Sequence, residues 1–277
     1  MSTAPRFKGK VALVTGAQRG IGRAIARSLA RGGATVGIVD VNDEIESVAV
    51  DISADDEVSA AGGRAWGSIG DITSPEAMTR VVARLNDDAG TIGILVNNAG
   101  VLGRREVLWT SDEDAWRHTL EVNLIGTYLV TKAVVPQMVE AGAGRVINIA
   151  SISGKQGSIA NSAYSASKHG VIGLTRSLAN DFGLNPQTRG ITANAICPGV
   201  TDTEMITGKG GAMAQLVELG EQSGSTMEEI AEKYIPSLQK RLMDPQEIAD
   251  MAVYLASDEA RGITGQAINV CGGSVFY

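Results

Sequence analysis

The chain has 277 residues, 44% of them hydrophobic, and a formal net charge of −7. This length allows one large domain or two small ones and a sizeable core without disulfides. The acidic balance argues against a nucleic-acid-binding surface, which would be basic and clustered. Two cysteines, Cys197 and Cys271, and two histidines, His118 and His169, are too few for a disulfide framework or a metal site. We therefore expect no metal and a reducing, cytoplasmic setting.

The N-terminal residues and the apolar runs predict neither a secretion signal nor a membrane span. Residues 1–10, MSTAPRFKGK, contain no apolar core and lead into a strand-like run. No stretch reaches the roughly 18 uninterrupted apolar residues that a membrane-spanning helix needs. We therefore expect no membrane partner.

Short β-branched runs alternate with longer helical patterns. The predicted strands lie at 11–15, 35–40, 92–98, 145–151, 191–197 and 266–270, with a weaker one at 64–71. The predicted helices lie at 20–32, 74–89, 112–140, 162–185 and 245–257. This alternation predicts an α/β fold, a Rossmann-like doubly wound parallel sheet with helices on both faces. No linker divides the chain, so we expect 1–277 to form a single dinucleotide-binding and catalytic domain.

One segment, 204–238, interrupts the alternation. It is helix-prone, is broken by glycines and lies between two predicted strands. Insertions of this kind often cover a site, so we predict a helical lid over the substrate. The alternative is a surface helical excursion with no role at the site.

A glycine turn joins the first predicted strand to the first predicted helix. Gly16, Gly20 and Gly22 form the pattern G-x-x-x-G-x-G in TGAQRGIG. Glycines let the backbone turn tightly and approach a pyrophosphate, and the helix N-terminus supplies unpaired N–H groups. A packing turn is the alternative, but the position after the first strand favours a dinucleotide site.

Asp40 and Arg19 point to different cofactors. Asp40 ends the second predicted strand, where a carboxylate accepts hydrogen bonds from ribose hydroxyls and repels a 2′-phosphate. Arg19, in the glycine turn, could instead pair with a 2′-phosphate. We weigh Asp40 more heavily, because it should sit at the ribose itself and because seven carboxylates follow between Asp43 and Glu57. The sequence therefore favours NAD(H) over NADP(H).

Tyr164 and Lys168 lie four residues apart in SAYSASKHG, and so share one face of the predicted helix. A free tyrosine has a pKa of about 10, too high for a base near neutral pH. A neighbouring ammonium stabilises the phenolate and lowers that pKa. The pair alone would be structural in most proteins. His169 points about 100° away from Lys168 and is not an acid–base candidate.

Six motifs stand in the order and spacing of one protein family. They are TGAQRGIG (15–22), NNAG (97–100), Asn123 in EVNLIGTYLV, Ser151 in INIASISG, YSASK (164–168) and CPGVTDTEM (197–205). The chain resembles the short-chain dehydrogenases/reductases, in the short single-domain subgroup with a Tyr-x-x-x-Lys pair. Any one motif could arise by chance, but all six together are specific. The resemblance extends from about Lys10 to the C-terminal ITGQAINVCGGS.

The resemblance implies roles for individual residues. Tyr164 would act as the acid/base and Ser151 would hydrogen-bond the substrate oxygen, with Ser153 as the fallback. Lys168 would hydrogen-bond the nicotinamide ribose, and Asn123 would hold a water that links Lys168 to solvent. The expected cofactor-binding residues are Gly16, Gln18, Arg19, Gly20, Ile21, Gly22, Asp40, Asp71, Ile72, Asn98, Ala99, Gly100, Tyr164, Lys168, Pro198, Gly199, Val200 and Thr203.

We expect an NAD(H)-dependent oxidoreductase that interconverts a secondary alcohol and its ketone by hydride transfer. The substrate would be a small molecule, such as a polyol, sugar, diol or hydroxy acid, and the resemblance implies a homotetramer. Arg104 and Arg105 could meet an anionic substrate, although such pairs are more often solvated or salt-bridged. Gln156 and Val200 could line the pocket.

Two alternatives stay open. The first is an NADPH-dependent 3-oxoacyl-thioester reductase, which Arg19 slightly favours and Asp40 opposes. The second is a non-catalytic NAD(H)-binding redox sensor. Relatives of that kind commonly lose the tyrosine or the lysine, and this chain keeps both.

Overall fold

A computed structural model describes residues 5–223 and 237–277 of the chain. In this part of the protein a seven-stranded sheet has the order β3-β2-β1-β4-β5-β6-β7, and every neighbouring pair is parallel. The strands are β1 (Val11–Thr15), β2 (Thr35–Asp40), β3 (Arg64–Ile69), β4 (Ile92–Asn97), β5 (Gly144–Ile149), β6 (Ile191–Pro198) and β7 (Ala267–Val270). All seven predicted strands, including the weak one at 64–71, are confirmed.

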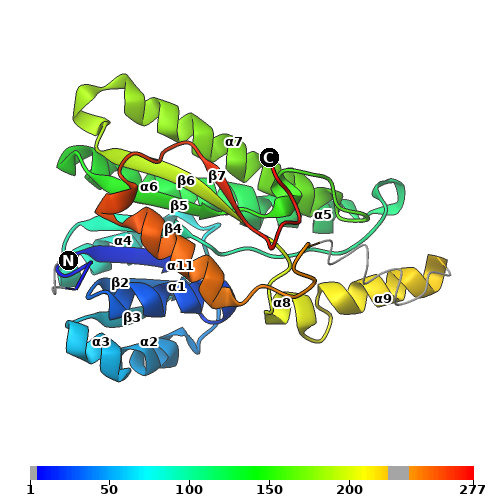
Figure 1. The fold of residues 1–277 in the computed structure, drawn as a ribbon, viewed down its shortest axis with the longest axis horizontal. Coiled ribbons are helices and arrows are strands. Elements are labelled where there is room, and N and C mark those ends of the chain that lie inside the picture. The colour runs from blue at the N-terminus through cyan, green and yellow to red at the C-terminus, as the bar shows by residue number, and fades with distance from the viewer. Residues whose placement is uncertain (1–4, 224–236) are drawn as a thin grey trace.

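Helices cover both faces of this sheet (Figure 1). They are α1 (Gly20–Arg31), α2 (Ile45–Ser53), α3 (Asp56–Ala61), α4 (Pro75–Ala89), α5 (Glu113–Leu120), α6 (Thr127–Ala141), α7 (Ser162–Leu184), α8 (Glu204–Thr207), α9 (Ala212–Ser223) and α11 (Pro245–Ala256). Buried side chains of α1, α2 and α11 form one core cluster on the sheet, and those of α4, α6 and α7 contribute to another. The predicted doubly wound α/β fold is therefore confirmed.

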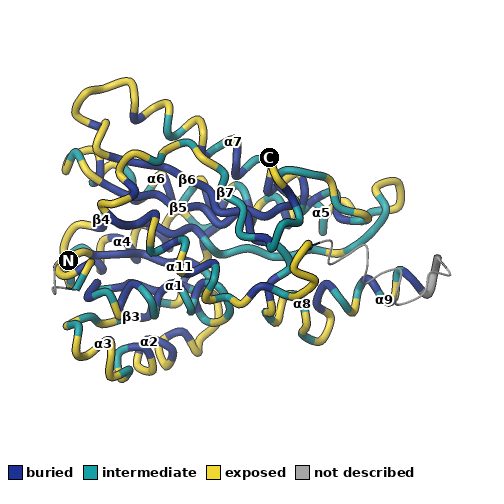
Figure 2. Tube along the Cα trace, in the orientation of Figure 1, coloured by how far each residue is buried: buried dark blue, intermediate teal, exposed yellow. Residues whose placement is uncertain are grey.

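Burial follows this layering (Figure 2). Every residue of β1 and β6 is buried, because helices lie on both faces of these strands. β3, at the edge of the sheet, is mostly exposed or half-buried. None of the helices within the described ranges is both long and apolar enough to cross a membrane.

Two regions differ from the sequence-based expectation. The acidic stretch after β2 folds into α2 and α3, which we did not predict. Its apolar residues Ile45, Val48 and Ile52 are buried, so a helical spacing was present beneath the charges. The helix predicted at 112–140 is confirmed as one run of helical backbone over 113–141, but it contains a π-helical turn, η2 (Glu121–Gly126), between α5 and α6.

The segment 204–238 contains α8 and α9, which stand away from the layers of the sheet (Figure 1). Residues 224–236 lie outside the described part, so the predicted lid is described only in its first half. The strand order reverses at β1: the chain builds β2 and β3 on one side of β1 and then crosses to β4 on the other side. At such a switch point the loops after the strands diverge and leave a crevice for a ligand.

Candidate cofactor and active site

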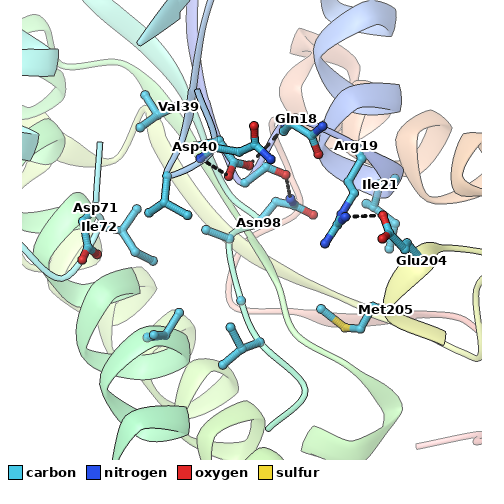
Figure 3. A pocket seen from close by; sticks show the side chains of 18 of the residues that line it. Gln18, Arg19, Ile21, Val39, Asp40, Asp71, Ile72, Asn98, Glu204 and Met205 are labelled. Atoms are coloured by element: carbon cyan, nitrogen blue, oxygen red, sulfur yellow. Dashed lines mark hydrogen bonds and ion pairs between the residues drawn. The ribbon is translucent and has the colours of Figure 1, made fainter. Parts of the chain in front are cut away.

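A cavity of about 450 Å³ opens at the carboxyl ends of β1, β2 and β4 (Figure 3). Its walls are the glycine turn, the ends of β2 and β4, the start of α8 and one face of α5. The lining residues are Gly16, Gln18, Arg19, Gly20, Ile21, Val39, Asp40, Val41, Asn42, Gly70, Asp71, Ile72, Asn98, Ala99, Gly100, Val101, His118, Val122, Thr203, Glu204 and Met205.

The glycine turn is packed too closely for side chains at two positions. Gly16 has φ +64°, and a Cβ there would lie 2.5 Å from Ala99 Cα. A Cβ at Gly22 would lie 2.3 Å from Gly16 O and 2.4 Å from Asn98 Nδ2. Asn98 Nδ2 donates to Thr15 O at 3.0 Å and to Gly16 O at 2.7 Å, which fixes the turn against β4. The turn is therefore a rigid backbone cradle.

The N-terminus of α1 leaves its amides open beside this cradle. The side chain of Arg19, the residue before the helix, makes no capping hydrogen bond to the helix, and the first turn contains no acidic residue. In contrast, Ser74 caps α4 and Asp244 caps α11 with side-chain oxygens. Unpaired amides and the helix dipole attract an anion. These features fit the pyrophosphate of a dinucleotide cofactor.

Asp40 is held in a fixed orientation at the end of β2. Its two carboxylate oxygens accept hydrogen bonds from Gln18 N and Asn42 N, each at 3.2 Å. Beside it, Gln18 Nε2 donates to Glu44 Oε2 at 2.8 Å. Gln18 is therefore hydrogen-bonded to two carboxylates, of which Asp40 lines the cavity. Asp71, at the end of β3, lines the same cavity while its Oδ1 accepts from Thr73 N at 2.8 Å.

Tyr164 and Lys168 lie together on α7, as their spacing predicts. Lys168 Nζ is 5.6 Å from the centre of the Tyr164 ring and donates to Ile149 O at 2.8 Å. A Cβ on Gly100, which lines the cavity, would lie 3.5 Å from Lys168 Nζ. The ammonium therefore lies beside both the phenol and the cavity wall.

Burial disfavours the charged form of the Lys168 side chain. Only 5% of the residue is exposed, and this burial lowers its pKa to about 8. The nearby Cys197 partly opposes the shift. Burial also raises the pKa of the Cys197 thiol, which favours its neutral form. A group with this pKa changes charge close to physiological pH, which is typical of functional sites.

Asn123 lies in the π-helical turn and is fully buried. Its Oδ1 accepts from Val101 N at 2.8 Å, and its Nδ2 donates to Val101 O at 2.9 Å and to Ser167 Oγ at 3.1 Å. The amide thus joins the loop after β4 to α7, one residue before Lys168. The predicted water between Asn123 and Lys168 stays a prediction.

Ser151 follows β5 and precedes the short 3₁₀ helix η3 (Ile152–Gly154). Its Oγ accepts from Ser153 N at 3.1 Å. A hydroxyl that accepts one hydrogen bond in this way keeps its own O–H available as a donor. Ser153, the fallback candidate, has its hydroxyl 2.8 Å from the Ser158 hydroxyl.

Most of the expected cofactor-binding residues line the cavity. Those that do are Gly16, Gln18, Arg19, Gly20, Ile21, Asp40, Asp71, Ile72, Asn98, Ala99, Gly100 and Thr203. Those outside its lining are Gly22, Tyr164, Lys168, Pro198, Gly199 and Val200. Gly199 packs on the end of β7, where a Cβ would lie 2.9 Å from Cys271 Cα.

Sequence reasoning missed several lining residues. They are Val39, Val41, Asn42, Gly70, Val101, His118, Val122, Glu204 and Met205. Most adjoin a residue that the motifs identified, so adjacency was the available signal. His118 and Val122 are four residues apart across the junction of α5 and the π turn, a spacing that brings side chains to one helix face.

The two arginines after β4 contact protein groups. Arg104 lies 3.7 Å from Glu106, and Arg105 Nη1 donates to Ile159 O at 2.9 Å. Arg105 N also donates to Gln215 Oε1, on α9, at 2.8 Å. The loop is thereby joined to the first half of the predicted lid. These contacts match the salt-bridged alternative more closely than a site open to an anion.

The fold and this cavity are those of a Rossmann-type dinucleotide-binding protein. The model of the short chain dehydrogenase family matches residues 10–212, and the chain belongs to this short-chain dehydrogenase/reductase family. The resemblance to this family that the six motifs indicated is therefore confirmed.

Curated and solved relatives show the breadth of this family. The chain is 37% identical over 272 residues to oxidoreductase UcpA of Escherichia coli strain K12, covering 98% of this chain and 96% of that protein. It is also 37% identical over 267 residues to the 3-oxoacyl-[acyl-carrier-protein] reductase FabG of Vibrio harveyi, covering 96% and 98%. A crystal structure of an actinorhodin polyketide ketoreductase variant with NADPH matches with a TM-score of 0.84 at 34% identity, covering 99% and 100%.

Proposed function

We propose that the chain is an NAD(H)-dependent oxidoreductase that interconverts a secondary alcohol of the polyol, sugar, diol or hydroxy acid class and its ketone. Tyr164 is the acid/base in this proposal. The observation that carries it is the buried Lys168 ammonium, 5.6 Å from the Tyr164 ring and next to the cavity wall. A cation at this position stabilises the phenolate. Tyr164 can therefore act as a base at a pH well below its ordinary pKa.

The chain's own residues divide the proton chemistry between them. In the oxidative direction the Tyr164 oxygen takes the proton of the substrate hydroxyl, and in the reductive direction it returns a proton to the forming alkoxide. Ser151, whose O–H is available as a donor, hydrogen-bonds the same substrate oxygen and stabilises its developing charge. Asn123 positions the loop that carries Val101. The bound nicotinamide supplies the hydride chemistry at the carbinol carbon.

NAD(H) is the cofactor in this proposal because of the charges around the ribose end of the cavity. Asp40 is oriented by two backbone amides, and Gln18, which supplies one of them, also donates through its side chain to Glu44. Carboxylates there accept hydrogen bonds from the ribose hydroxyls and repel a 2′-phosphate. Arg19, the group that would favour NADP(H), forms an ion pair with Glu204.

A second candidate function is an NADPH-dependent 3-oxoacyl-thioester reductase. The similarity to FabG and to a ketoreductase solved with NADPH favours it, and so does the arginine in the glycine turn. A non-catalytic redox sensor is less well supported, because Tyr164, Lys168 and Ser151 are all retained.

The remaining parts of the proposal concern the surroundings of the site. The contact between Arg105 and Gln215 supports a lid formed by 204–238. We also propose a cytoplasmic homotetramer that acts on a small molecule, without a nucleic-acid or membrane partner. The net charge of −7 supports the absence of a nucleic-acid partner.

The test combines a substrate screen with a tyrosine variant. NAD- and NADP-linked oxidation is measured across polyols, sugars, diols, hydroxy acids and 3-hydroxyacyl thioesters. Tyr164→Phe should then lower kcat on the best substrate by at least about a hundredfold, because general acid–base catalysis contributes that much. NADH binding, followed by fluorescence, should change less than about twofold, because the ring remains.

Tyr254→Phe is the matched control, since this tyrosine is 40% exposed on α11, outside the described cavity lining. Near wild-type turnover of Tyr164→Phe would rule out the proposed mechanism. A best substrate among the acyl thioesters, used with NADPH, would favour the second candidate.

A further inference from the structure

Arg19 and Glu204 come from distant parts of the sequence and meet at the mouth of the cavity. Arg19 precedes α1 in the glycine turn, and Glu204 is the first residue of α8, within the predicted lid. Their side chains form an ion pair, and Figure 3 shows them pointing toward one another. Both residues line the cavity, and their side chains are 60% and 58% exposed.

The backbone on either side of this ion pair is also closely packed. Gly20, next to Arg19, has φ +56°, and a Cβ there would lie 3.2 Å from Thr203 Cγ2. Thr203 immediately precedes Glu204. The Thr203 side chain therefore leaves little room at Gly20, so the segments that carry Arg19 and Glu204 lie close together.

Arg19 is the one lysine or arginine among the described residues that line the cavity. The other charged groups of this lining are the carboxylates of Asp40, Asp71 and Glu204. A cofactor with a 2′-phosphate needs a cation to offset its charge. Among the described lining residues that cation is Arg19, and Glu204 competes for it.

We propose that Glu204 is a specificity-determining residue, which holds Arg19 in an ion pair and so lowers the affinity of the cavity for a 2′-phosphate. This inference rests on the proposed preference for NAD(H) and gives it a second cause besides Asp40. Asp40 repels the phosphate directly, whereas Glu204 acts through the guanidinium that would otherwise bind it. The start of α8 thereby contributes to the choice of cofactor.

The experiment measures dissociation constants of NADH and NADPH by fluorescence titration of the full chain. It compares the wild type, Glu204→Gln, Arg19→Gln and the double variant. Glu204→Gln should strengthen NADPH binding by about three- to fivefold, since an exposed ion pair is a weak competitor. NADH binding should change less than about twofold, because it has no 2′-phosphate. In the Arg19→Gln background, the same glutamate substitution should have little effect on either cofactor.

Glu259→Gln is the matched control. It removes the same charge from another exposed ion pair, that of Arg6 and Glu259, which lies outside the described lining of the cavity. It should leave the ratio of the two dissociation constants unchanged, which excludes a general effect of net charge. Added salt should reduce the gain from Glu204→Gln, because the interaction that is released is electrostatic.

Three results would overturn the inference. One is an unchanged NADPH affinity in Glu204→Gln. The second is an equal gain in the Arg19→Gln background, which would mean that Glu204 repels the phosphate without acting through Arg19. The third is an equal gain for NADH. The wild-type ratio of kcat/KM for NAD and NADP tests the proposed function separately, because the coupling of Arg19 and Glu204 can be present or absent whichever cofactor is preferred.

Discussion

The two sides of the site are built differently. On the cofactor side, the glycine turn, β2 and β4 approach each other so closely that a single Cβ at Gly16 or Gly22 would overlap backbone atoms. On the substrate side, the described part of the predicted lid meets the loop after β4 through Gln215, whose hydrogen bonds to Arg105 N and Gly103 O are 2.8 and 3.4 Å long.

This difference explains which parts of the function are evident in the sequence. A backbone cradle accepts only glycine at certain positions, so the reaction class leaves a residue pattern that can be recognised. Polar contacts between loops accept many residue types, so the substrate leaves a much weaker pattern. Three experiments test this contrast, beginning with the side where we expect the larger effects.

The largest effect is expected for Gly22→Ala. The added Cβ would lie 2.3 Å from Gly16 O and 2.4 Å from Asn98 Nδ2, so the turn must move. We expect a loss of about 3 kcal/mol in the free energy of unfolding, the upper range for overpacking. NADH affinity should fall at least about tenfold, because in the proposed site the turn holds the pyrophosphate. Urea denaturation and fluorescence titration measure the two quantities.

Gly183→Ala provides the control for Gly22→Ala. Gly183 is an exposed residue of α7, and a Cβ there would meet no atom within 4 Å. The alanine should change stability by less than about 1 kcal/mol, in the stabilising direction. Equal effects of the two substitutions would contradict the idea of a rigid cradle.

The second effect concerns the cost of burying Lys168. Its folded-state pKa of about 8 lies below the ordinary value of 10.5, so the charged form destabilises the fold below pH 8. Between pH 8 and 10.5 the unfolded chain binds the proton more tightly, and stability therefore rises with pH in this window.

Lys168→Met removes the buried charge and also the hydrogen bond to Ile149 O. We expect a net gain of about 2 kcal/mol at pH 7, together with loss of activity. The advantage over the wild type should shrink as the pH rises toward 10, because the wild-type lysine becomes neutral. Urea denaturation at pH 7, 8, 9 and 10 measures this trend. A pH-independent difference would contradict the assigned pKa.

The smallest effect is expected on the substrate side, for Gln215→Ala. Stability should fall by less than about 1 kcal/mol, because the lost hydrogen bonds are partly exposed. KM for the alcohol should rise severalfold while the dissociation constant of NADH stays unchanged. Gln246→Ala is the control, since it removes a glutamine that bonds Ser28 and Asp250 on α1 and α11. Parallel changes in KM for both variants would argue against a lid.

The sequence was informative wherever one residue type was required. It predicted the sheet, the glycine turn, Asp40 at the end of β2, and the shared face of Tyr164 and Lys168. It did not predict α2 and α3, because charged residues obscured their apolar spacing. It also gave no sign of the Arg19–Glu204 ion pair, since 185 residues separate the two and the tertiary fold brings them together.

The π-helical turn, Glu121–Gly126, limits where the chain can gain or lose a residue. Each added residue rotates a helix by about 100°, so this turn sets the phase between α5 and α6. Upstream, His118 faces the cavity, and downstream Val130 and Val134 are buried on the sheet. Deleting one residue here would restore a regular helix but rotate one of these faces away from its partner. We therefore regard the turn as a spacer of fixed length, because a single-residue deletion would displace one of the two faces.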